Sequence, residues 1–500
     1  MTPPTVDPPL EAWMLAVESR DARFDGWVIV GVTSTGIYCR PSCPTPVRPK
    51  RSNMAFFPTP ASAQAAGFRA CKRCAPDASP GSPEWNRRDD LVARAVRAVD
   101  DGVVDREGVD GLARRLHVSA RHLHRLLARE LGVGPLALAR ARRARTARAL
   151  IETTDLAFSD VAFASGFESI RQFNDTIREV FAQTPTQLRA ATSHRRDVAA
   201  PNWIDVRLGV REPFAVDQVW GWLAAHAIAG VEEVDGAIFR RSLRLPGGHG
   251  VVELEPVTAS GGGAWIQARY RLDDFADLAA AVQASRRLLD LDADPTIIDD
   301  ALTRDRSIAA LVQRQPGLRS PGDVSGSDAT IRAVLHQQVS LASARAMAAR
   351  LVGQLGEPLA EPVGAVTTVF PGAEVWAAAD PSSLGLTTAR ADTVVRVATA
   401  LADDTLDVSP LADRAAARAQ LLAIKGIGPW TASIVALRGL ADPDAFTTSD
   451  LALNRVAQEL GVAEVGDAAG LERAATAWRP WRSYAMHHLW HHYLTKKDED

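Results

Sequence analysis

Four cysteines lie close together near the start of this 500-residue sequence, and their spacing suits metal binding. They are Cys39, Cys43, Cys71 and Cys74, and no cysteine follows in residues 75–500. The pattern is C-x3-C, a long gap, then C-x2-C, which brings two pairs of thiolates together as zinc requires. Two disulfides are the alternative, but disulfides are rare in a reducing cytoplasm. The sequence therefore predicts one zinc ion per chain, bound by all four cysteines.

The residues around these cysteines resemble the N-terminal domain of the Ada family of alkylation-response proteins. The resemblance runs from about Asp21 to Pro83 and rests on FDGWVIVGVTSTGIYCRPSCPTP followed by NMAFFPTPASAQAAGFRACKRC. It implies a small α+β zinc domain in residues 1–84, in which Cys39 accepts the methyl group of a methyl phosphotriester in DNA. A metal-bound thiolate is nucleophilic, and the triester is uncharged, so the two can approach. Methylation of Cys39 would remove one negative charge and raise the affinity for DNA.

Basic residues surround the cysteines. They either bind DNA phosphates or only solvate the surface, and the sequence favours neither reading. They are Arg40, Arg48, Lys50, Arg51, Arg69, Lys72 and Arg73. No residue pattern suggests that a methylated cysteine is regenerated, so the transfer would occur once per chain.

Residues 85–194 have the periodicity of helices and contain two similar patterns of helix, short turn and helix. In the first, GLARRLHVSARHLHRLLARELG, the second helix begins near Ser119 as its N-cap. In the second, DLAFSDVAFASGFESIRQFNDTIREVFAQTP, Gly166 lies in the turn and Ser169–Phe181 form the second helix. Residues 114–148 contain ten arginines and one acidic residue, which predicts a strong local positive field.

These two units, joined by a helix over ARARRARTARALIETT, resemble the DNA-binding domain of the AraC family of transcription regulators. The family's core is present as Gly166, Phe167, Ser169 and Phe173. The resemblance implies that the second helix of each unit enters the major groove of DNA. The side chains expected to contact DNA are Arg121, His122, Arg125, Arg171, Gln172 and Asn174. The alternative is that they form solvated helix faces.

The second half of the chain begins with a predicted small α+β domain at residues 203–290. Strands are predicted where apolar residues alternate, in DVRLGVREPF, AIFRRSLRLPGGHGVVELEPV and GAWIQARYRLDD. Helices are predicted over DQVWGWLAAHA and LAAAVQASRRLLDL. No residue here suggests chemistry, and from residue 291 onward the pattern predicts helices only. The segment 194–203 is the predicted hinge between the two halves.

A glycine pair in LLAIKGIGPWTASIVALRG predicts a phosphate-binding hairpin. Gly426 and Gly428 lie between two apolar helices, and Lys425 adds a positive charge. Glycines let the backbone approach a phosphate closely, and the N-terminus of the following helix offers free N–H groups. The sequence therefore predicts a helix–hairpin–helix that binds DNA without regard to base sequence.

About twenty residues after the hairpin, AFTTSDLALNR places Asp450 at the start of an apolar helix. This aspartate is either an N-cap or a catalytic carboxylate. Hairpin and aspartate, together with WRPWRSYAMHHLWHHYL and HQQVSLASARAMAARL, resemble the AlkA type of 3-methyladenine DNA glycosylase over about residues 203–494. The resemblance implies a glycosylase domain at residues 291–497, in which Asp450 stabilises the positive sugar and Trp430 and Trp490 stack on the flipped base.

Three departures from related proteins refine this prediction. Trp430 occupies the place of the lysine with which related glycosylases cut the strand, so the activity is predicted to be hydrolytic and monofunctional. Gln338 stands where the family has a leucine wedge and Ile434 where it has a pocket tyrosine, which leaves the lesion preference open. All cysteines belong to the metal site and no P-C-H-R motif is present, so O6-methylguanine transfer is excluded.

Length and composition agree with a folded, multidomain protein, and the helical patterns above predict a mainly α fold class. Hydrophobic residues make up 46% and charged residues 23%, which excludes a disordered chain. No apolar run is long enough to span a membrane, and no signal sequence is visible, so a bacterial cytoplasmic location, nucleoid-associated when DNA is bound, is predicted.

The predicted function is an adaptive response to DNA alkylation. Methyl transfer to Cys39 would activate transcription, and the second half would excise alkylated purines. The expected partners are double-stranded DNA, both alkylated and promoter DNA, and RNA polymerase, for a monomeric chain. One alternative is a regulator whose glycosylase half is a catalytically weak DNA-binding scaffold. Another is a repair enzyme whose helix–turn–helix units only add nonspecific affinity.

Overall fold

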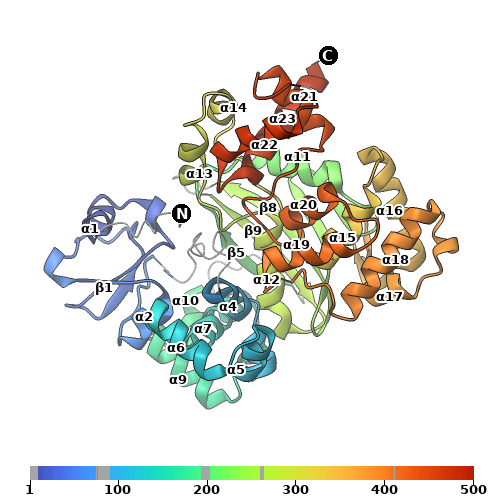
Figure 1. The fold of residues 1–500 in the computed structure, drawn as a ribbon. Helices are drawn as coiled ribbons and strands as arrows, with labels where there is room; N and C mark the ends of the chain where they lie inside the picture. Colours follow the sequence, from blue (N-terminus) through green and yellow to red (C-terminus); the bar gives the residue numbers. More distant parts are fainter. Residues whose placement is uncertain are drawn as a thin grey trace. The chain divides into compact units, whose positions relative to one another are not determined.

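The computed structural model describes residues 10–74, 76, 91–192, 203–258, 264–409, 411–464 and 466–499. These residues form two compact units, one within residues 10–209 and one within residues 210–499. Their secondary structure is drawn in Figure 1. The predicted domain boundaries at residues 84, 85 and 194 and the predicted hinge, apart from its last residue, lie outside the described residues.

The first unit opens with a small mixed sheet that carries the cysteines. Its strands are β1 (Ile29–Val32), β2 (Ile37–Cys39), β3 (Met54–Phe57) and β4 (Arg69–Ala70), in the order β3-β1-β2-β4. Strands β1 and β2 form a hairpin, whereas β2 and β4 run parallel. Parallel strands end at the same edge of a sheet, so the chain that leaves β2 and the chain that leaves β4 are brought together there. Two helices, α1 (Leu10–Ser19) and α2 (Pro60–Ala65), accompany the sheet.

Within its described residues, the rest of the first unit is mainly helical and contains both predicted helix–turn–helix patterns. Its helices are α4 (Leu91–Asp100), α5 (Val103–Arg115), α6 (Ala120–Leu131), α7 (Pro135–Thr153), α8 (Phe158–Ala164), α9 (Ile170–Phe181) and α10 (Pro185–Thr192). Ser119 caps α6 and Ser169 caps α9 by accepting backbone N–H bonds, as predicted for Ser119. Gly166 has a φ of +87° in the second turn. A side chain is strained at that φ, which explains the glycine.

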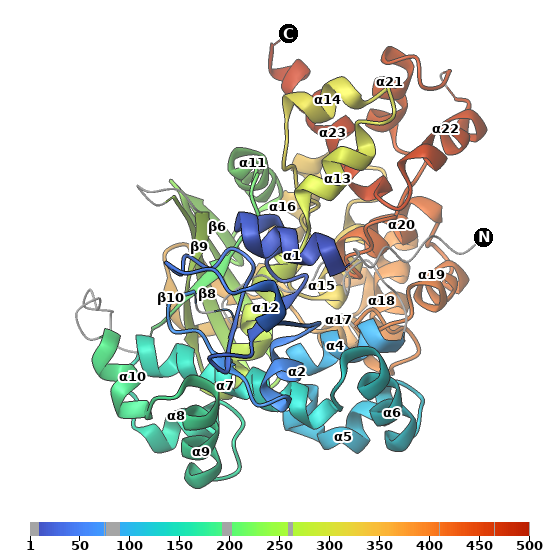
Figure 2. The same cartoon turned by 90° about the vertical axis from the view of Figure 1, so that its left-hand side faces the viewer.

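A five-stranded sheet in the order β5-β9-β8-β7-β6 contributes its antiparallel strands β6 to β9 to the second unit. The strands are β5 (Ile204–Gly209), β6 (Glu232–Asp235), β7 (Ile238–Leu245), β8 (Gly248–Thr258) and β9 (Ala264–Leu272). Helix α11 (Val216–His226) follows β5, and α12 (Leu278–Leu288) packs against β7 and β9 (Figure 2). The predicted α+β character of this region is confirmed.

The remainder of the second unit is mainly helical. Its helices are α13 (Pro295–Leu302), α14 (Ala309–Arg314), α15 (Gly326–Leu335), α16 (Leu341–Leu355), α17 (Ala373–Ala378), α18 (Thr388–Ala402), α19 (Arg414–Ala423), α20 (Pro429–Arg438), α21 (Leu451–Glu459), α22 (Ala468–Ala475) and α23 (Arg482–Glu499). Their apolar faces share one core, in which the rings of Trp376 and Trp478 are buried.

The prediction of helices only from residue 291 onward is wrong for one segment. Strands β10 (Glu357–Val363) and β11 (Val366–Val369) form a hairpin that turns at Gly364, where φ is +57°. The hairpin is held to an earlier part of the unit because the N–H groups of Thr367 and Thr368 both donate to the carbonyl of Gly230. Such a contact between distant segments is not visible in a local pattern.

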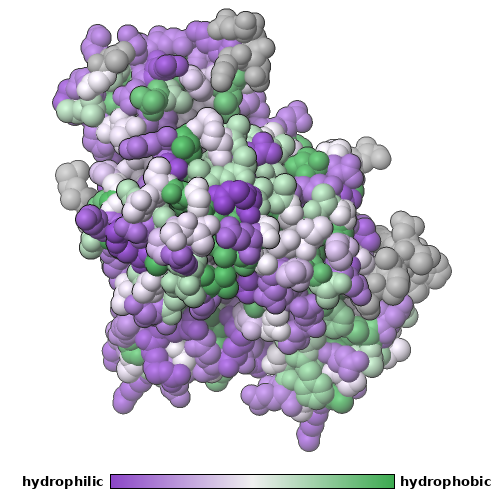
Figure 3. Space-filling model, turned by 90° about the vertical axis from the view of Figure 1, so that its right-hand side faces the viewer, coloured by the Kyte–Doolittle hydropathy of each residue, from purple (hydrophilic) through white to green (hydrophobic). Residues whose placement is uncertain are grey.

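No helix within the described ranges is both long and apolar enough to cross a membrane. The face drawn in Figure 3 is mostly hydrophilic, with hydrophobic residues in small separate groups.

Candidate metal centre and candidate DNA site

The four cysteine sulfur atoms meet at one point of the first unit, all within 4.8 Å of one another. The Sγ atoms of Cys43 and Cys71 are 3.9 Å apart. A tetrahedral zinc ion with bonds of about 2.3 Å to sulfur requires about 3.8 Å between sulfur atoms, so this donor set fits zinc. Cys39, Cys43 and Cys74 are buried and Cys71 is partly exposed. Among the residues that the structure describes, no other group of His, Cys, Asp or Glu converges in this way.

Backbone hydrogen bonds and one buried carboxylate hold the cysteine loops. The N–H of Cys71 donates to the carbonyl of Tyr38, which ties the two parallel strand ends together. Asp25, only 5% exposed, accepts from the N–H of Ser42 at 3.0 Å and from its Oγ at 2.5 Å. Asp25 also pairs with Arg40 at 3.4 Å. Sequence reasoning missed Asp25, although it lies within the segment that resembles the Ada family.

The environment of Cys39 disfavours a thiolate unless a cation is present. Contact with Cys43, followed by contacts with Cys71 and Cys74 and by burial, raises the pKa of the Cys39 thiol far above its ordinary value. Four thiolates in contact would repel one another, and a bound divalent cation offsets their negative charge. The four-sulfur cluster is therefore consistent with a resident metal ion.

The seven basic residues around the cluster are not equivalent. Arg51 pairs with Glu11 at 2.7 Å and with Glu18 at 2.6 Å, and Arg40 pairs with Asp25. Four other basic residues of this group are exposed and have no ion pair within the described part of the chain: Arg48, Lys50, Lys72 and Arg73. These four are the better candidates for phosphate contacts.

The side chains predicted to contact DNA from the first helix–turn–helix are accessible. Arg121, His122 and Arg125 are all exposed on α6. Their neighbours Leu123 and Leu127 are fully buried, which fixes the face that α6 turns outward.

The residues of the second helix–turn–helix that are predicted to contact DNA differ in exposure and in their contacts. Arg171 is exposed, with a side-chain exposure of 93%, and Asn174 is half-buried. The Oε1 atom of Gln172 accepts from the N–H of Glu168 at 3.2 Å, so this side chain serves as part of the cap of α9. Gln172 thus has a structural role that the sequence reading did not assign.

The arginine-rich segment is less positive than its composition suggests. Arg142 and Arg143 on α7 are buried and both pair with Asp105 of α5. Burial lowers the pKa of Arg142 to about 10, which still leaves it charged at neutral pH. Arg140 pairs with Glu179 of α9. Several of these arginines therefore hold the helices together, and the prediction of a strong field from all ten is corrected.

The predicted hairpin lies between α19 and α20. Gly426 has a φ of +101°, and a Cβ atom there would collide with the side chain of Thr393. Its carbonyl accepts from Nε2 of Gln337 at 3.0 Å. Gly428 is the N-cap of α20, and a Cβ there would meet nothing within 4 Å. Lys425 is exposed beside them. The hairpin backbone is therefore anchored on one side and open on the other, as phosphate binding requires.

The Asp450 carboxylate accepts hydrogen bonds from four N–H groups, which belong to three helices. It is the N-cap of α21, and its Oδ1 atom accepts from the N–H groups of Ala452 at 3.0 Å and Leu453 at 3.1 Å. The indole N–H of Trp430 in α20 donates to Oδ2 at 3.2 Å, and that of Trp490 in α23 donates to Oδ1 at 3.2 Å. The two readings of Asp450 are compatible, because one carboxylate both caps the helix and lies between the two tryptophans.

A third tryptophan extends this aromatic group. The ring of Trp222 in α11 stacks on that of Trp490, with centroids 6.0 Å apart. His487 meets both rings edge-on, at 5.0 Å and 5.1 Å. The guanidinium of Arg438 lies 4.5 Å from the centroid of Trp222. Sequence reasoning missed Trp222, since the only local signal was a tryptophan in an amphipathic helix.

The two positions that depart from the family pattern also flank the hairpin and the tryptophans. Gln338 is exposed between α15 and α16 and has a φ of +52°. Ile434 is half-buried in α20 and packs against the core. Gln338 is therefore accessible to a bound macromolecule.

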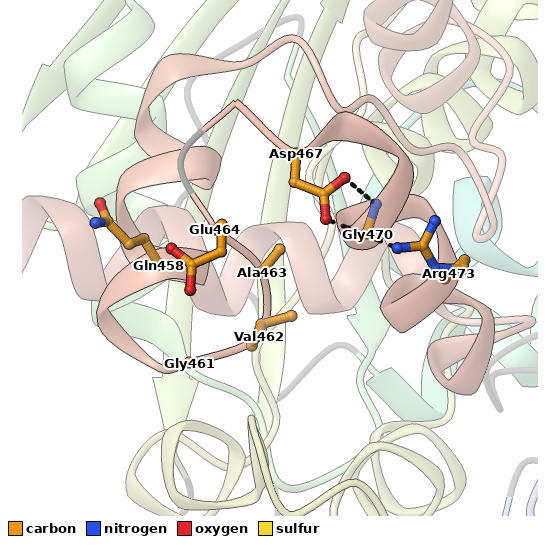
Figure 4. Close-up of a pocket in the computed structure, with 8 residues that line it drawn as sticks. All are labelled: Gln458, Gly461, Val462, Ala463, Glu464, Asp467, Gly470 and Arg473. Atoms are coloured by element: carbon orange, nitrogen blue, oxygen red, sulfur yellow. Dashed lines mark hydrogen bonds and ion pairs between the residues drawn. The ribbon is translucent and has the colours of Figure 1, made fainter.

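A surface groove elsewhere in the unit is distinct from this site. It lies where the chain leaves α21 and enters α22 (Figure 4). Its lining includes Asp467, which accepts from the N–H of Gly470 and pairs with Arg473 at 3.7 Å. Asp450 caps the start of α21, whereas the groove begins at the end of this helix. Because a helix rises about 1.5 Å per residue, the length of α21 separates the two.

Comparisons with known proteins match the order of these units. Family models match for the metal binding domain of Ada over residues 12–77, a helix-turn-helix domain over residues 112–191 and the AlkA N-terminal domain over residues 205–325. A protein of Mycobacterium tuberculosis, described as a probable bifunctional transcriptional activator/DNA repair enzyme AlkA, is 52% identical over 478 residues. That alignment covers 95% of each chain.

Two further matches concern the second half of the chain. DNA-3-methyladenine glycosylase 2 of Escherichia coli is 33% identical over 287 residues, which cover 57% of this chain and 96% of that protein. Among solved structures, a 3-methyladenine DNA-glycosylase from Archaeoglobus fulgidus superposes with a TM-score of 0.50 at 21% identity, over 57% of this chain and 96% of that one. This likeness concerns the fold.

Proposed function

The chain belongs to the family of bifunctional transcriptional activator/DNA repair enzymes AlkA, and from this premise we propose how its residues divide the work. The first unit contains a zinc site and helix–turn–helix units, and the second has the fold of a DNA glycosylase. We propose that the first unit removes methyl groups from DNA phosphotriesters and then activates transcription. The second unit hydrolyses the glycosidic bond of alkylated purines of the 3-methyladenine type.

Methyl transfer is assigned to Cys39. Its sulfur attacks the methyl carbon, a sulfur–carbon bond forms, and the bond from that carbon to the ester oxygen breaks, which leaves an ordinary phosphodiester anion. Zinc, when bound by Cys39, Cys43, Cys71 and Cys74, keeps the sulfur atoms as thiolates. Arg48, Lys50, Lys72 and Arg73 attract the neighbouring phosphates. Asp25 holds the loop that carries Cys43 in place.

Base excision is assigned to Asp450. The damaged nucleotide leaves the helix stack, and its electron-poor base is received by the faces of Trp430 and Trp490. Breakage of the glycosidic bond leaves positive charge on the sugar, which the Asp450 carboxylate stabilises while water adds to the sugar carbon. The hairpin at Gly426 and Gly428 binds the phosphate backbone.

The observation that carries this assignment is the convergence of two indole N–H groups on Asp450 at 3.2 Å each. The tryptophans come from different helices, 60 residues apart in sequence, and neither position is explained by helix capping. Four donors fix the orientation of the carboxylate, and preorganised charge of this kind is the main source of electrostatic catalysis.

The test is release of free 3-methyladenine from methylated duplex DNA by the full-length chain, measured by chromatography. Mass spectrometry of the same sample should show one added methyl group on Cys39. Release of base without methylation of Cys39 would separate the two assignments, and methylation of another residue would contradict the first.

A regulator with a catalytically weak second half is the alternative, and Gln338 and Ile434 favour it because both depart from the family pattern. Binding of alkylated DNA without release of base would support that alternative.

For the regulator function we further propose that the monomeric chain binds promoter DNA through Arg121, His122, Arg125, Arg171 and Asn174. We also propose that it contacts RNA polymerase and that it is cytoplasmic and associated with the nucleoid.

A further inference from the structure

We propose that Leu451 and Arg455, on the exposed face of α21, form an additional DNA contact beside the candidate catalytic carboxylate. The proposal rests on the function proposed above, because it takes the damaged nucleotide to lie at Asp450. It assigns to Leu451 an apolar contact with the DNA next to the lesion and to Arg455 a contact with a backbone phosphate.

Leu451 is an apolar side chain left in water at a fixed position. Its relative exposure is 81%, the greatest of any large hydrophobic residue in the described ranges. It is the first residue of α21, directly after Asp450, whose carboxylate caps the helix. Leu453 and Val456 of the same helix are buried, at 0% and 1% exposure, so Leu451 points away from the core. An exposed leucine is common on protein surfaces, but here it is adjacent to the candidate catalytic residue.

Arg455 gives the same face a positive charge. It follows Leu451 by four residues, which places both side chains on one side of the helix. Arg455 is exposed and donates to the hydroxyl of Tyr493 at 3.3 Å, with no carboxylate partner in the part of the chain that the structure describes. Glu459, one turn further, is paired with Lys496 at 2.6 Å. The exposed guanidinium is therefore free to bind an anion.

This combination of charges and apolar surface fits DNA. The Cα atoms of Asp450 and Leu451 are about 3.8 Å apart, so a sugar held at the carboxylate brings the neighbouring nucleotide within reach of the leucine. The side chain of Arg455 starts about 6 Å farther along the helix, a distance comparable with one or two nucleotide steps. The accessible residue at the wedge position, Gln338, is polar, so Leu451 supplies an apolar contact that Gln338 does not.

The experiment compares full-length wild-type chain with Leu451→Ser and Arg455→Gln, and uses Ile297→Ser as a control. Ile297 is also a large exposed apolar residue, at 41%, on α13. The probe is duplex DNA with one stable abasic analogue, and its Kd is measured at several salt concentrations. This probe requires no base release.

Leu451→Ser should raise Kd about tenfold, which corresponds to about 1.4 kcal/mol, by the same factor at every salt concentration. Arg455→Gln should lower the slope of log affinity against log salt by about 0.9, the value expected for one lost phosphate contact. Leu451→Met should retain the wild-type Kd, because it keeps the apolar surface. Unfolding temperatures identify any variant that fails to fold.

Two results test the additional DNA contact and the proposed glycosylase function separately. If both variants bind the abasic duplex as Ile297→Ser does, the additional contact is refuted. If the wild-type chain releases no 3-methyladenine, the proposed glycosylase function fails, whereas the binding comparison still decides whether Leu451 and Arg455 contact DNA.

Discussion

Replacement of Asp450 by asparagine tests the candidate catalytic carboxylate while leaving the helix cap in place. Asn and Asp are similar N-caps, so the bonds from Ala452 and Leu453 are retained. With these bonds kept, Oδ1 remains an oxygen and also keeps the bond from the indole N–H of Trp490. The amide NH2 group takes the place of Oδ2, so the indole N–H of Trp430 loses its partner, at a cost of about 1 kcal/mol in unfolding free energy. The unfolding temperature should therefore fall by only a few degrees.

The rate of base release should fall far more, because the negative charge is lost. Two unit charges about 4 Å apart interact by about 4 kcal/mol at an effective dielectric constant of about 20. Since about 1.4 kcal/mol corresponds to tenfold in rate, Asp450→Asn should slow release about a thousandfold. The assay is single-turnover release of 3-methyladenine from methylated duplex DNA.

Asp380→Asn is the matched control, because Asp380 is also an N-cap, of the short 3-10 helix Pro381–Leu384. It should release base at the wild-type rate. Methylation of Cys39 should be unchanged in both variants. A rate for Asp450→Asn within tenfold of wild type, with a folded protein, would refute the catalytic assignment and leave helix capping as the role of this residue.

Four further predictions concern other parts of the chain. Cys43→Ser should lower the bound zinc and the unfolding temperature of the first unit without changing base release; a full zinc content would contradict the four-cysteine site. Arg125→Ala should weaken promoter-DNA binding and reduce its salt dependence, and an unchanged salt slope would argue for a solvated helix face. Gly426→Ala should lower the unfolding temperature and DNA affinity more than Gly428→Ala, because only the former creates a collision; equal losses would contradict the hairpin geometry. Burial lowers the pKa of His488 to about 3, so the unfolded chain binds the additional proton and stability should fall as pH drops below about 6.5; His488→Leu should flatten that loss in thermal unfolding between pH 7 and 4, and an unchanged pH profile would show that His488 does not cause it.

The sequence by itself determined the features that depend on local spacing and on side-chain chemistry. Four clustered cysteines predicted the metal site, Ser119 and Gly166 marked helix starts and turns, and the glycine pair at Gly426 and Gly428 predicted the hairpin. Each of these signals lies within a short segment. A cap, a turn or a pair of ligands is formed by residues that are neighbours along the chain, so its pattern is visible before folding.

The tertiary structure decided which distant residues meet. It placed Trp490 against Asp450, 40 residues away in sequence, brought Trp222 to the same aromatic group, and tied the cysteine loop to Asp25. It also buried Arg142 and Arg143 against Asp105, which removed them from the predicted local positive field. Such contacts depend on how whole elements pack, because burial and pairing are properties of the assembled core and no single helix or strand contains them.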